Sequence, residues 1–203
     1  MSRADIDAAV VALRTGGLAV VPTDTVYGLA CDPDRTEALE RIAALKGRTP
    51  DQPIALVAAS LEILFDRVPE VPGPLRVLVS ELLPGPFTLV LPNPAERYPW
   101  LAGRRADTIG VRVPALAGVA QALLEIVGAV AATSANLHGG ADPRRVEDVP
   151  VEIVEAAVVL EGGELPGTPS TVVDLTLPEP TVLREGAVPA DEALARIHRL
   201  RGK

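Results

Sequence analysis

The stretch Leu18-Ala19-Val20-Val21-Pro22-Thr23-Asp24-Thr25-Val26-Tyr27-Gly28 joins a short apolar run to a polar loop. The apolar run 18–21 is typical of a buried strand, and Pro22 ends that strand. Two hydroxyls, a carboxylate and a phenol follow at once. In open α/β sheets, ligands bind at loops that follow strands. The stretch therefore predicts a buried strand with a candidate binding loop at its end.

Outward from this stretch, helical and extended patterns alternate along the chain. Apolar residues at helical spacing predict helices at about 3–15, 36–46, 61–68, 74–83, 116–127 and 191–200. Short apolar runs predict strands at 18–21, 54–57, 87–91, 109–113, 129–133, 158–160, 171–175 and 182–183. This alternation favours an α/β fold of the α+β type, with a twisted mixed sheet flanked by helices.

The composition is that of a soluble globular protein. With 203 residues, 48% hydrophobic and 23% charged, the chain fits one domain spanning 1–203. It contains no apolar run long enough for a membrane span and no signal-peptide pattern, so we expect a cytoplasmic location. Cys31 is the one cysteine, which excludes a disulfide framework, and with only His138 and His198 we expect no metal centre.

Charge and aromatic content argue against broad nucleic-acid binding. The formal net charge is −8, although a local basic groove stays possible. Platforms for single-stranded nucleic acid need several aromatic side chains among basic ones, and aromatic residues make up only 2% of this chain.

Lys46 is unusual because the chain has two lysines, Lys46 and Lys203, against seventeen arginines. The apolar residues of its helix recur at i, i+3 and i+4, and Lys46 follows at i+7 on the same stripe. A compact ammonium suits a phosphate ligand. The pattern is equally compatible with a chance surface lysine, a snorkelling side chain, or a cation that, with Arg48, stabilises the helix C-terminus.

Further polar side chains lie within or beside predicted strands. Arg112 lies on strand 109–113 beside a glycine, where it could bind a carboxylate or phosphate or form a structural ion pair. Ser134 and Asn136 follow strand 129–133, in a segment that could also be a plain turn. Ser170 immediately precedes strand 171–175, and Arg184 follows strand 182–183.

Familiar nucleotide motifs are missing from the sequence. Gly162 and Gly167 have the spacing of a P-loop, but Thr168 stands where the lysine is required. A nucleotide would therefore be bound by dispersed cations and hydroxyls.

Seven segments together resemble the Sua5/YrdC/YciO family. They are Thr23-Asp24-Thr25-Val26-Tyr27-Gly28-Leu29, Lys46-Gly47-Arg48, Leu83-Pro84-Gly85-Pro86-Phe87-Thr88-Leu89, Gly110-Val111-Arg112-Val113-Pro114, Thr133-Ser134-Ala135-Asn136, Pro169-Ser170-Thr171-Val172-Val173-Asp174 and Leu183-Arg184-Glu185-Gly186. The resemblance covers about 18–188 and is closest to the short, single-domain synthases. It implies a YrdC-like fold with a concave substrate groove.

The resemblance also implies an activity. Members of this type condense L-threonine, bicarbonate and ATP into threonylcarbamoyl-AMP and pyrophosphate, with Mg²⁺ carried by the ATP. A partner transferase complex then moves the threonylcarbamoyl group to tRNA, so direct tRNA binding is expected to be weak. No covalent nucleophile is required, and Cys31 is expected to be a packing residue.

Site residues follow from matching motif positions. The resemblance assigns catalysis to Lys46 and Arg48. It assigns ATP binding to Lys46, Arg48, Thr108, Ser134, Asn136 and Arg184, and threonine binding to Thr25, Gln52, Arg112 and Ser170. Family members often have proline directly after Lys-x-Arg, where this chain has Thr49, and His or Asn where it has Gln52. Because glutamine can still hydrogen-bond a hydroxyl, we expect altered geometry and retained function.

Two alternatives come from other functional classes. A YciO-type RNA-binding or regulatory protein would have the same fold, but the acidic charge and the intact Ser134-Ala135-Asn136 segment favour the synthase. A domain like that of hydrogenase-maturation carbamoyltransferases would be accompanied by zinc-finger cysteines, which a chain with one cysteine does not have.

Overall fold

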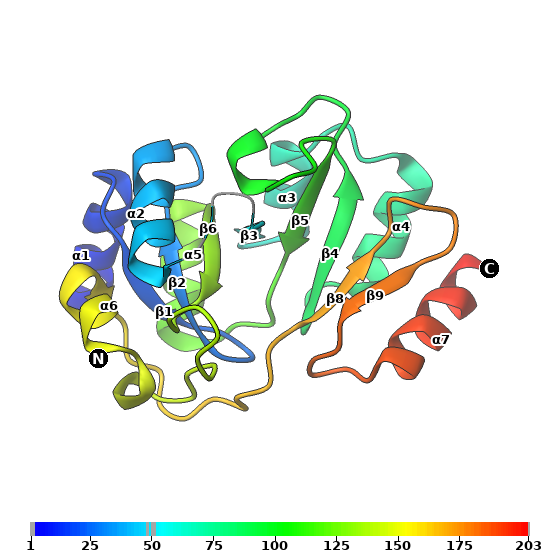
Figure 1. Ribbon diagram of the computed structural model, residues 1–203. Helices are drawn as coiled ribbons and strands as arrows, with labels where there is room; N and C mark the ends of the chain where they lie inside the picture. Colours follow the sequence, from blue (N-terminus) through cyan, green and yellow to red (C-terminus); the bar gives the residue numbers. More distant parts are fainter. Residues whose placement is uncertain (1–2, 48, 50–51, 203) are drawn as a thin grey trace.

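The computed structural model describes residues 3–47, 49 and 52–202. Helices and strands alternate along the chain, as the sequence predicts (Figure 1). The helices are α1 (Arg3–Arg14), α2 (Thr36–Lys46), α3 (Leu61–Arg67), α4 (Gly73–Leu82), α5 (Gly118–Val127), α6 (Val151–Ala156) and α7 (Ala190–Arg201), with 3-10 turns η1 (Pro99–Leu101) and η2 (Val146–Asp148). The strands are β1 (Ala19–Pro22), β2 (Tyr27–Cys31), β3 (Ala55–Ala58), β4 (Phe87–Pro92), β5 (Thr108–Arg112), β6 (Ala129–Ser134), β7 (Val158–Val159), β8 (Thr171–Asp174) and β9 (Thr181–Arg184).

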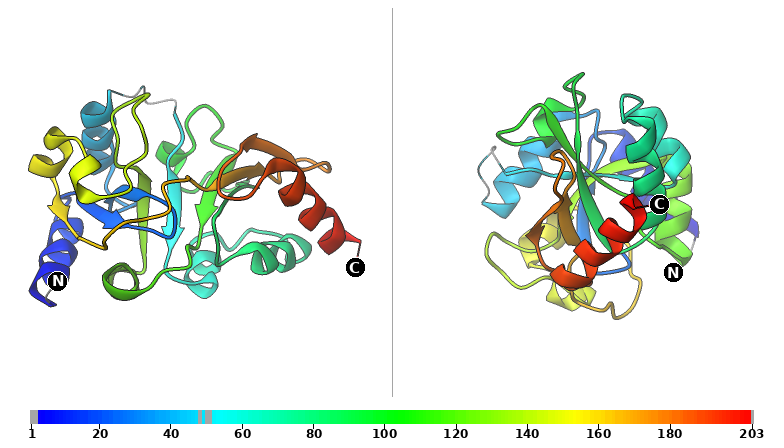
Figure 2. Two further views of the ribbon diagram at one scale, coloured as in Figure 1. Left: turned by 90° about the horizontal axis from the view of Figure 1, so that it is seen from below. Right: turned by 90° about the vertical axis from the view of Figure 1, so that its right-hand side faces the viewer.

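The strands of the described residues form one mixed sheet in the order β7-β1-β2-β6-β3-β5-β4-β8-β9. The β1/β7, β3/β5 and β4/β8 pairs are parallel, and the other neighbouring strands are antiparallel. Helices α1, α2, α5 and α6 surround one half of this sheet, and α4 and α7 lie at the other half (Figures 1 and 2). The predicted fold class, a twisted mixed sheet flanked by helices, is confirmed.

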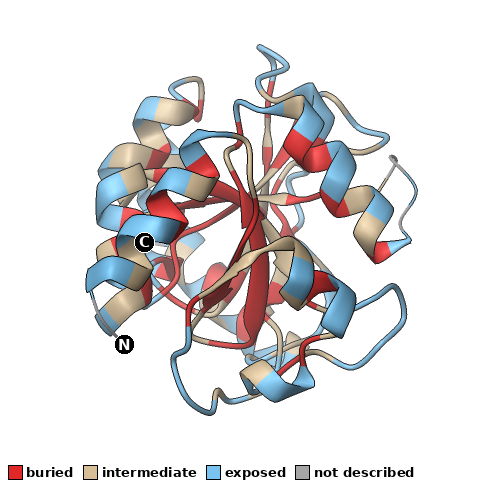
Figure 3. Ribbon diagram, turned by 90° about the vertical axis from the view of Figure 1, so that its left-hand side faces the viewer, coloured by how far each residue is buried: buried red, intermediate tan, exposed pale blue. Residues whose placement is uncertain are grey.

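One face of the sheet carries the main apolar core. The register places Leu56, Val111, Leu89 and Val173 in a row across β3, β5, β4 and β8, and each of these side chains is fully buried. Figure 3 shows this buried core along the central strands, with exposed residues on the outward sides of the helices.

The opposite face of the sheet is apolar in one half and more polar in the other half. Val57 and Val130 pack in a second apolar cluster with residues of α1 and α5. Farther along the same face, the register leads from Val57 to Arg112, and β4 contributes the half-buried Thr88 and Val90. The alternation in β4, buried at Phe87, Leu89 and Leu91, therefore leaves a polar and small-residue surface.

Two elements differ from the sequence prediction. The sequence predicts loop at strand β2, because the preceding Thr-Asp-Thr segment and Gly28 hide its short apolar pattern; it is a fully buried strand between β1 and β6. Helix α6 is not predicted either, since its six residues are too few to show a clear helical period. Helix α5 begins at Gly118 rather than at residue 116. Among the described residues, no helix has both the length and the apolar character needed to cross a bilayer.

Candidate active site

A cavity of about 760 Å³ opens on the polar half of the sheet face. This volume is within the range of small-molecule sites, roughly 300–1,000 Å³. The predicted site residues that line it are Lys46, Gln52, Thr108, Arg112, Ser134, Asn136, Ser170 and Arg184. The fold thus brings together residues that lie up to 138 positions apart in the chain.

Lys46 holds the loop that follows β6. Gly47 ends helix α2 in the left-handed conformation (φ 63°), which leaves Lys46 on the last turn, facing inward with 4% of its surface exposed. Its Nζ donates to the carbonyl oxygens of Ser134 and Asn136, both at 2.5 Å, and to Asn136 Oδ1 at 2.8 Å. Ser134 Oγ donates to the same Oδ1 at 2.7 Å. Lys46, Ser134 and Asn136 therefore form one hydrogen-bonded unit at the cavity wall.

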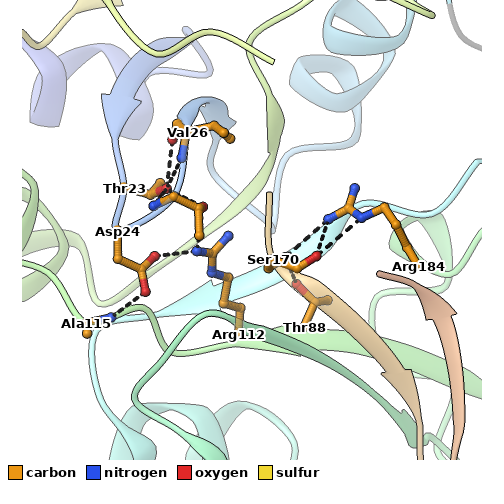
Figure 4. A network of polar contacts seen from close by, with 9 residues as sticks. Thr23, Asp24, Val26, Thr88, Arg112, Ala115, Ser170 and Arg184 are labelled. Carbon is orange, nitrogen blue, oxygen red and sulfur yellow. Dashed lines mark hydrogen bonds and ion pairs between the residues drawn. The ribbon is translucent and has the colours of Figure 1, made fainter. Parts of the chain in front are cut away.

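Arg112 is buried against a carboxylate. Its Nη2 donates to Asp24 Oδ1 (Figure 4). The same Nη2 donates to the Thr25 hydroxyl at 2.8 Å. The second Asp24 oxygen accepts from the Ala115 amide at 3.0 Å. Burial lowers the pKa of Arg112, and the Asp24 carboxylate opposes that shift. The structural ion pair is thus present.

Arg112 also keeps capacity for a ligand. Its Nε is buried and has no hydrogen-bond partner, while the residue lines the cavity. A buried unpaired donor is costly, so a carboxylate that accepts from this edge would satisfy it. Thr25 is fully buried beside Arg112, and its hydroxyl also lies 3.0 Å from that of Thr23.

Ser170 and Arg184 meet on the far side of the cavity. Arg184 Nη2 donates to the Ser170 carbonyl at 2.8 Å and to its hydroxyl at 3.2 Å, and Thr88 Oγ1 lies 2.8 Å from Ser170 Oγ (Figure 4). Burial lowers the pKa of Arg184, and the charge of Asp142 opposes that shift. Both arginines are therefore positioned where a negatively charged ligand would stabilise them.

The remaining predicted residues have less defined partners. Thr108 is 5% exposed and donates its hydroxyl proton to the Arg105 carbonyl at 2.9 Å. Gln52 lines the cavity. Arg48, a predicted catalytic and ATP-binding residue, lies outside the described residues.

Several residues in or beside the cavity are absent from the predicted site. Asp24 orients Arg112, and Thr88 contacts Ser170. Arg104, Arg105, His138 and Asp142 also line the wall. The sequence could have pointed to Thr88, because it is the one hydroxyl residue in the strand Phe87–Pro92, whose residues alternate between buried and half-buried. The others lie in loops whose sequence shows no periodicity.

Comparison with known proteins identifies the family. The profile named Sua5_yciO_yrdC, described as "Telomere recombination", matches residues 11–186. The threonylcarbamoyl-AMP synthase of Pyrococcus abyssi is 37% identical over 183 residues, which is 89% of this chain and 53% of that protein. This chain therefore spans about half the length of that relative.

Two solved structures extend the comparison. P. abyssi Sua5 complexed with L-threonine has a TM-score of 0.81 and 35% identity, covering 95% of this chain and 57% of that one. Escherichia coli YciO has a TM-score of 0.78 and 32% identity, covering 92% and 91%. The profile match, the sequence identity and the shared fold agree: the chain belongs to the Sua5/YciO/YrdC family.

Proposed function

We propose that this protein is an L-threonylcarbamoyladenylate synthase, a nucleotidyltransferase that condenses L-threonine, bicarbonate and ATP. The main support is the cavity that joins the Lys46–Ser134–Asn136 unit to a buried arginine with an unpaired Nε. Relatives carry the synthase name, and a similar structure is complexed with L-threonine.

The threonine half of the site would be built around Arg112. Its unpaired Nε suits the α-carboxylate, while Asp24 and Thr25 hold Nη2 of the same guanidinium. Ser170 and Gln52 line the same cavity and supply hydrogen bonds to the amine and the side-chain hydroxyl.

The nucleotide half would use Lys46, Arg48, Thr108, Ser134, Asn136 and Arg184. The buried Lys46 ammonium fixes the Ser134–Asn136 loop, and with Arg184 it supplies positive charge at the cavity wall. Positive charge and hydroxyl donors in a site that excludes water stabilise growing negative charge far better than they would in solution.

The proposed reaction has two steps. The threonine amine attacks the carbon of bicarbonate, and loss of water leaves a carbamate. A carbamate oxygen then attacks the α-phosphorus of ATP, the bond to the bridging oxygen breaks, and pyrophosphate leaves. Holding three substrates in one cavity supplies much of the rate by orientation.

Magnesium would enter as part of the substrate. Within residues 3–47, 49 and 52–202, no three His, Cys, Asp or Glu side chains are grouped to hold a metal ion. The cavity donors are mostly cations, hydroxyls and amides, which do not fit a resident metal ion but do fit a triphosphate. When bound with ATP, Mg²⁺ neutralises phosphate charge.

In the cell, the product would pass to a threonylcarbamoyl transferase complex that modifies tRNA. This role follows from the family resemblance and the synthase name of the relatives. The competing candidate is a YciO-type RNA-binding or regulatory protein, which the 91% coverage of E. coli YciO favours. The intact lysine–serine–asparagine unit favours the synthase.

Substrate omission tests the proposal directly. Purified protein with Mg-ATP, L-threonine and bicarbonate should release pyrophosphate, and omitting any one substrate should abolish that release. Equal release without threonine would rule out the assigned reaction and leave the YciO-type candidate.

A further inference from the structure

Thr88 lies between two of the groups that the proposed function assigns to threonine, Arg112 and Ser170. The β4/β5 ladder pairs Val90 with Gly110 and Leu89 with Val111, so Thr88 and Arg112 are the next residues on the same face. Side chains at such facing positions have Cβ atoms about 4.5–5.5 Å apart. On its other side, Thr88 pairs with Val172 of β8, close to Ser170. Thr88 therefore faces Arg112 across the β4/β5 ladder on one side and contacts Ser170 on the other.

The orientation of Thr88 is set by its neighbours. A Cβ built on Gly110 would lie 3.8 Å from Thr88 Cγ2, so the methyl group leans toward β5. The hydroxyl points the other way, 2.8 Å from Ser170 Oγ. Gly110 and Thr88 both line the cavity.

Hydrogen-bond capacity shows what this pair can offer. Ser170 Oγ has one proton and two lone pairs, and Arg184 Nη2 occupies one lone pair at 3.2 Å. If Thr88 donates to Ser170, the Ser170 proton is directed to the cavity and Thr88 offers acceptors. If Ser170 donates to Thr88, the Thr88 proton is directed to the cavity and each oxygen keeps an acceptor. In either arrangement the pair presents one donor together with acceptors.

We propose that Thr88 is a further amino-acid-binding residue, acting with Ser170 as a paired hydroxyl site. The pair matches an α-amino acid whose carboxylate bonds Arg112, because one hydroxyl can donate to the carboxylate and the other can accept from the amine. Because either arrangement keeps an acceptor, the same pair can hold the amine before carbamate formation and the carbamate N–H afterwards. This inference rests on the proposed function.

The test is a set of substitutions that separates the hydroxyl from the side-chain shape. Thr88→Val keeps the branched shape and removes the hydroxyl, whereas Thr88→Ser keeps the hydroxyl. We expect Thr88→Val to weaken L-threonine binding, measured by calorimetry, at least tenfold and to leave the KM for ATP within twofold. Thr88→Ser should bind threonine within about threefold of the parent protein. Thr88→Ala serves as a second hydroxyl-free variant if Thr88→Val does not fold.

Coupling to Ser170 provides an independent readout. If the two hydroxyls act as one pair, the Thr88→Val/Ser170→Ala double variant should bind threonine no more than about threefold worse than the weaker single variant. Parent-like threonine affinity in folded Thr88→Val would overturn the inference, as would equal losses for threonine and ATP with a lower melting temperature. A parent protein that neither binds threonine nor releases pyrophosphate would instead refute the proposed function.

Discussion

At the residue scale, the structure decides what holds Lys46 in place. With 4% of its surface exposed, Lys46 is neither a chance surface residue nor a snorkelling side chain. Its ammonium donates to two carbonyl oxygens and one amide oxygen of the loop after β6. Its charge still lies at the C-terminus of α2, where it also suits the helix dipole. We expect lysine to be required there, because a planar guanidinium cannot occupy the same small volume.

Substitution of Lys46 should therefore affect activity and stability differently by variant. Lys46→Met keeps the length but leaves three oxygens without this donor, which should cost about 1–3 kcal/mol of unfolding free energy. Lys46→Arg retains the charge but displaces the Ser134–Asn136 loop, so pyrophosphate release should fall at least about tenfold. Denaturant titration and the substrate-omission assay measure the two effects. Full activity of a well-folded Lys46→Arg variant would show that the geometry of this unit does not matter.

Cys31 provides a prediction about alkaline stability. Burial, and secondly the charge of Asp32, raises the pKa of its thiol from 9.0 to about 12. In the unfolded chain the thiol ionises near pH 9.0. The stabilisation of the folded state that comes from keeping this thiol protonated is therefore complete below pH 9 and is lost as the pH rises toward 12. Between these values the unfolding free energy should fall by up to about 1.4 kcal/mol per pH unit from this group.

Comparison of the parent protein with Cys31→Ala at pH 8 and pH 10.5 tests this expectation. The variant should be less stable at pH 8, because a buried side chain is truncated, but should lose less stability on going to pH 10.5. The same loss in both proteins would show that Cys31 does not titrate on unfolding. Pyrophosphate release by the variant at pH 8 should match the parent, since Cys31 is fully buried and is not among the cavity-lining residues.

At the element scale, the segment 161–170 connects β7, at one edge of the sheet, to β8 near the other (Figure 1). It has no helix or strand of its own and is held by side-chain and backbone hydrogen bonds to neighbouring segments. The Tyr27 hydroxyl donates to the Gly163 carbonyl at 2.8 Å and accepts from the Gly162 amide at 2.9 Å. The Gly167 amide donates to the Thr25 carbonyl at 2.9 Å. The segment thus ties the threonine candidates Thr25 and Ser170 together.

Removal of the Tyr27 hydroxyl should loosen this segment. Tyr27→Phe keeps the buried ring and should lower the unfolding free energy by about 0.5–1.5 kcal/mol. Amide hydrogen exchange should accelerate at 161–170, and the KM for threonine should rise more than the KM for ATP.

Tyr98→Phe is the matched control, because the Tyr98 hydroxyl accepts from Arg67 and neither residue lines the cavity. It should alter stability without changing the KM for threonine. Unchanged exchange at 161–170 in Tyr27→Phe would show that the segment does not depend on the phenol.

At the scale of the whole molecule, charge predicts weak RNA binding. The net charge is −8, so the molecule as a whole repels the phosphates of RNA. We expect tRNA affinity to be weak and to fall steeply with salt, because binding would depend on phosphate contacts and counterion release. Filter binding at several salt concentrations measures this. Sub-micromolar affinity at physiological salt would favour the YciO-type candidate.

The periodic elements could be predicted from sequence because their signal is local. Helices α2 and α7 and strands β4 and β5 lie within a few residues of the predicted ranges. Strand β2 could not be predicted, because it follows a polar loop directly, and helix α6 could not be predicted, because it is too short to show a helical period. The structure shows where the site residues lie, and their roles toward substrate stay predictions.

The sequence by itself determined the fold class, the apolar stripe that carries Lys46 and the polar segments at strand ends, all of which follow from local periodicity and turn chemistry. Only the tertiary structure decided that Lys46 pairs with the Ser134–Asn136 loop, that Asp24 faces Arg112, and that Thr88 contacts Ser170. The Lys46 and Asp24 contacts join residues 88–90 positions apart, and the Thr88–Ser170 contact spans 82. The physical reason is that strand order and register place such residues side by side, and no local pattern encodes which strands become neighbours.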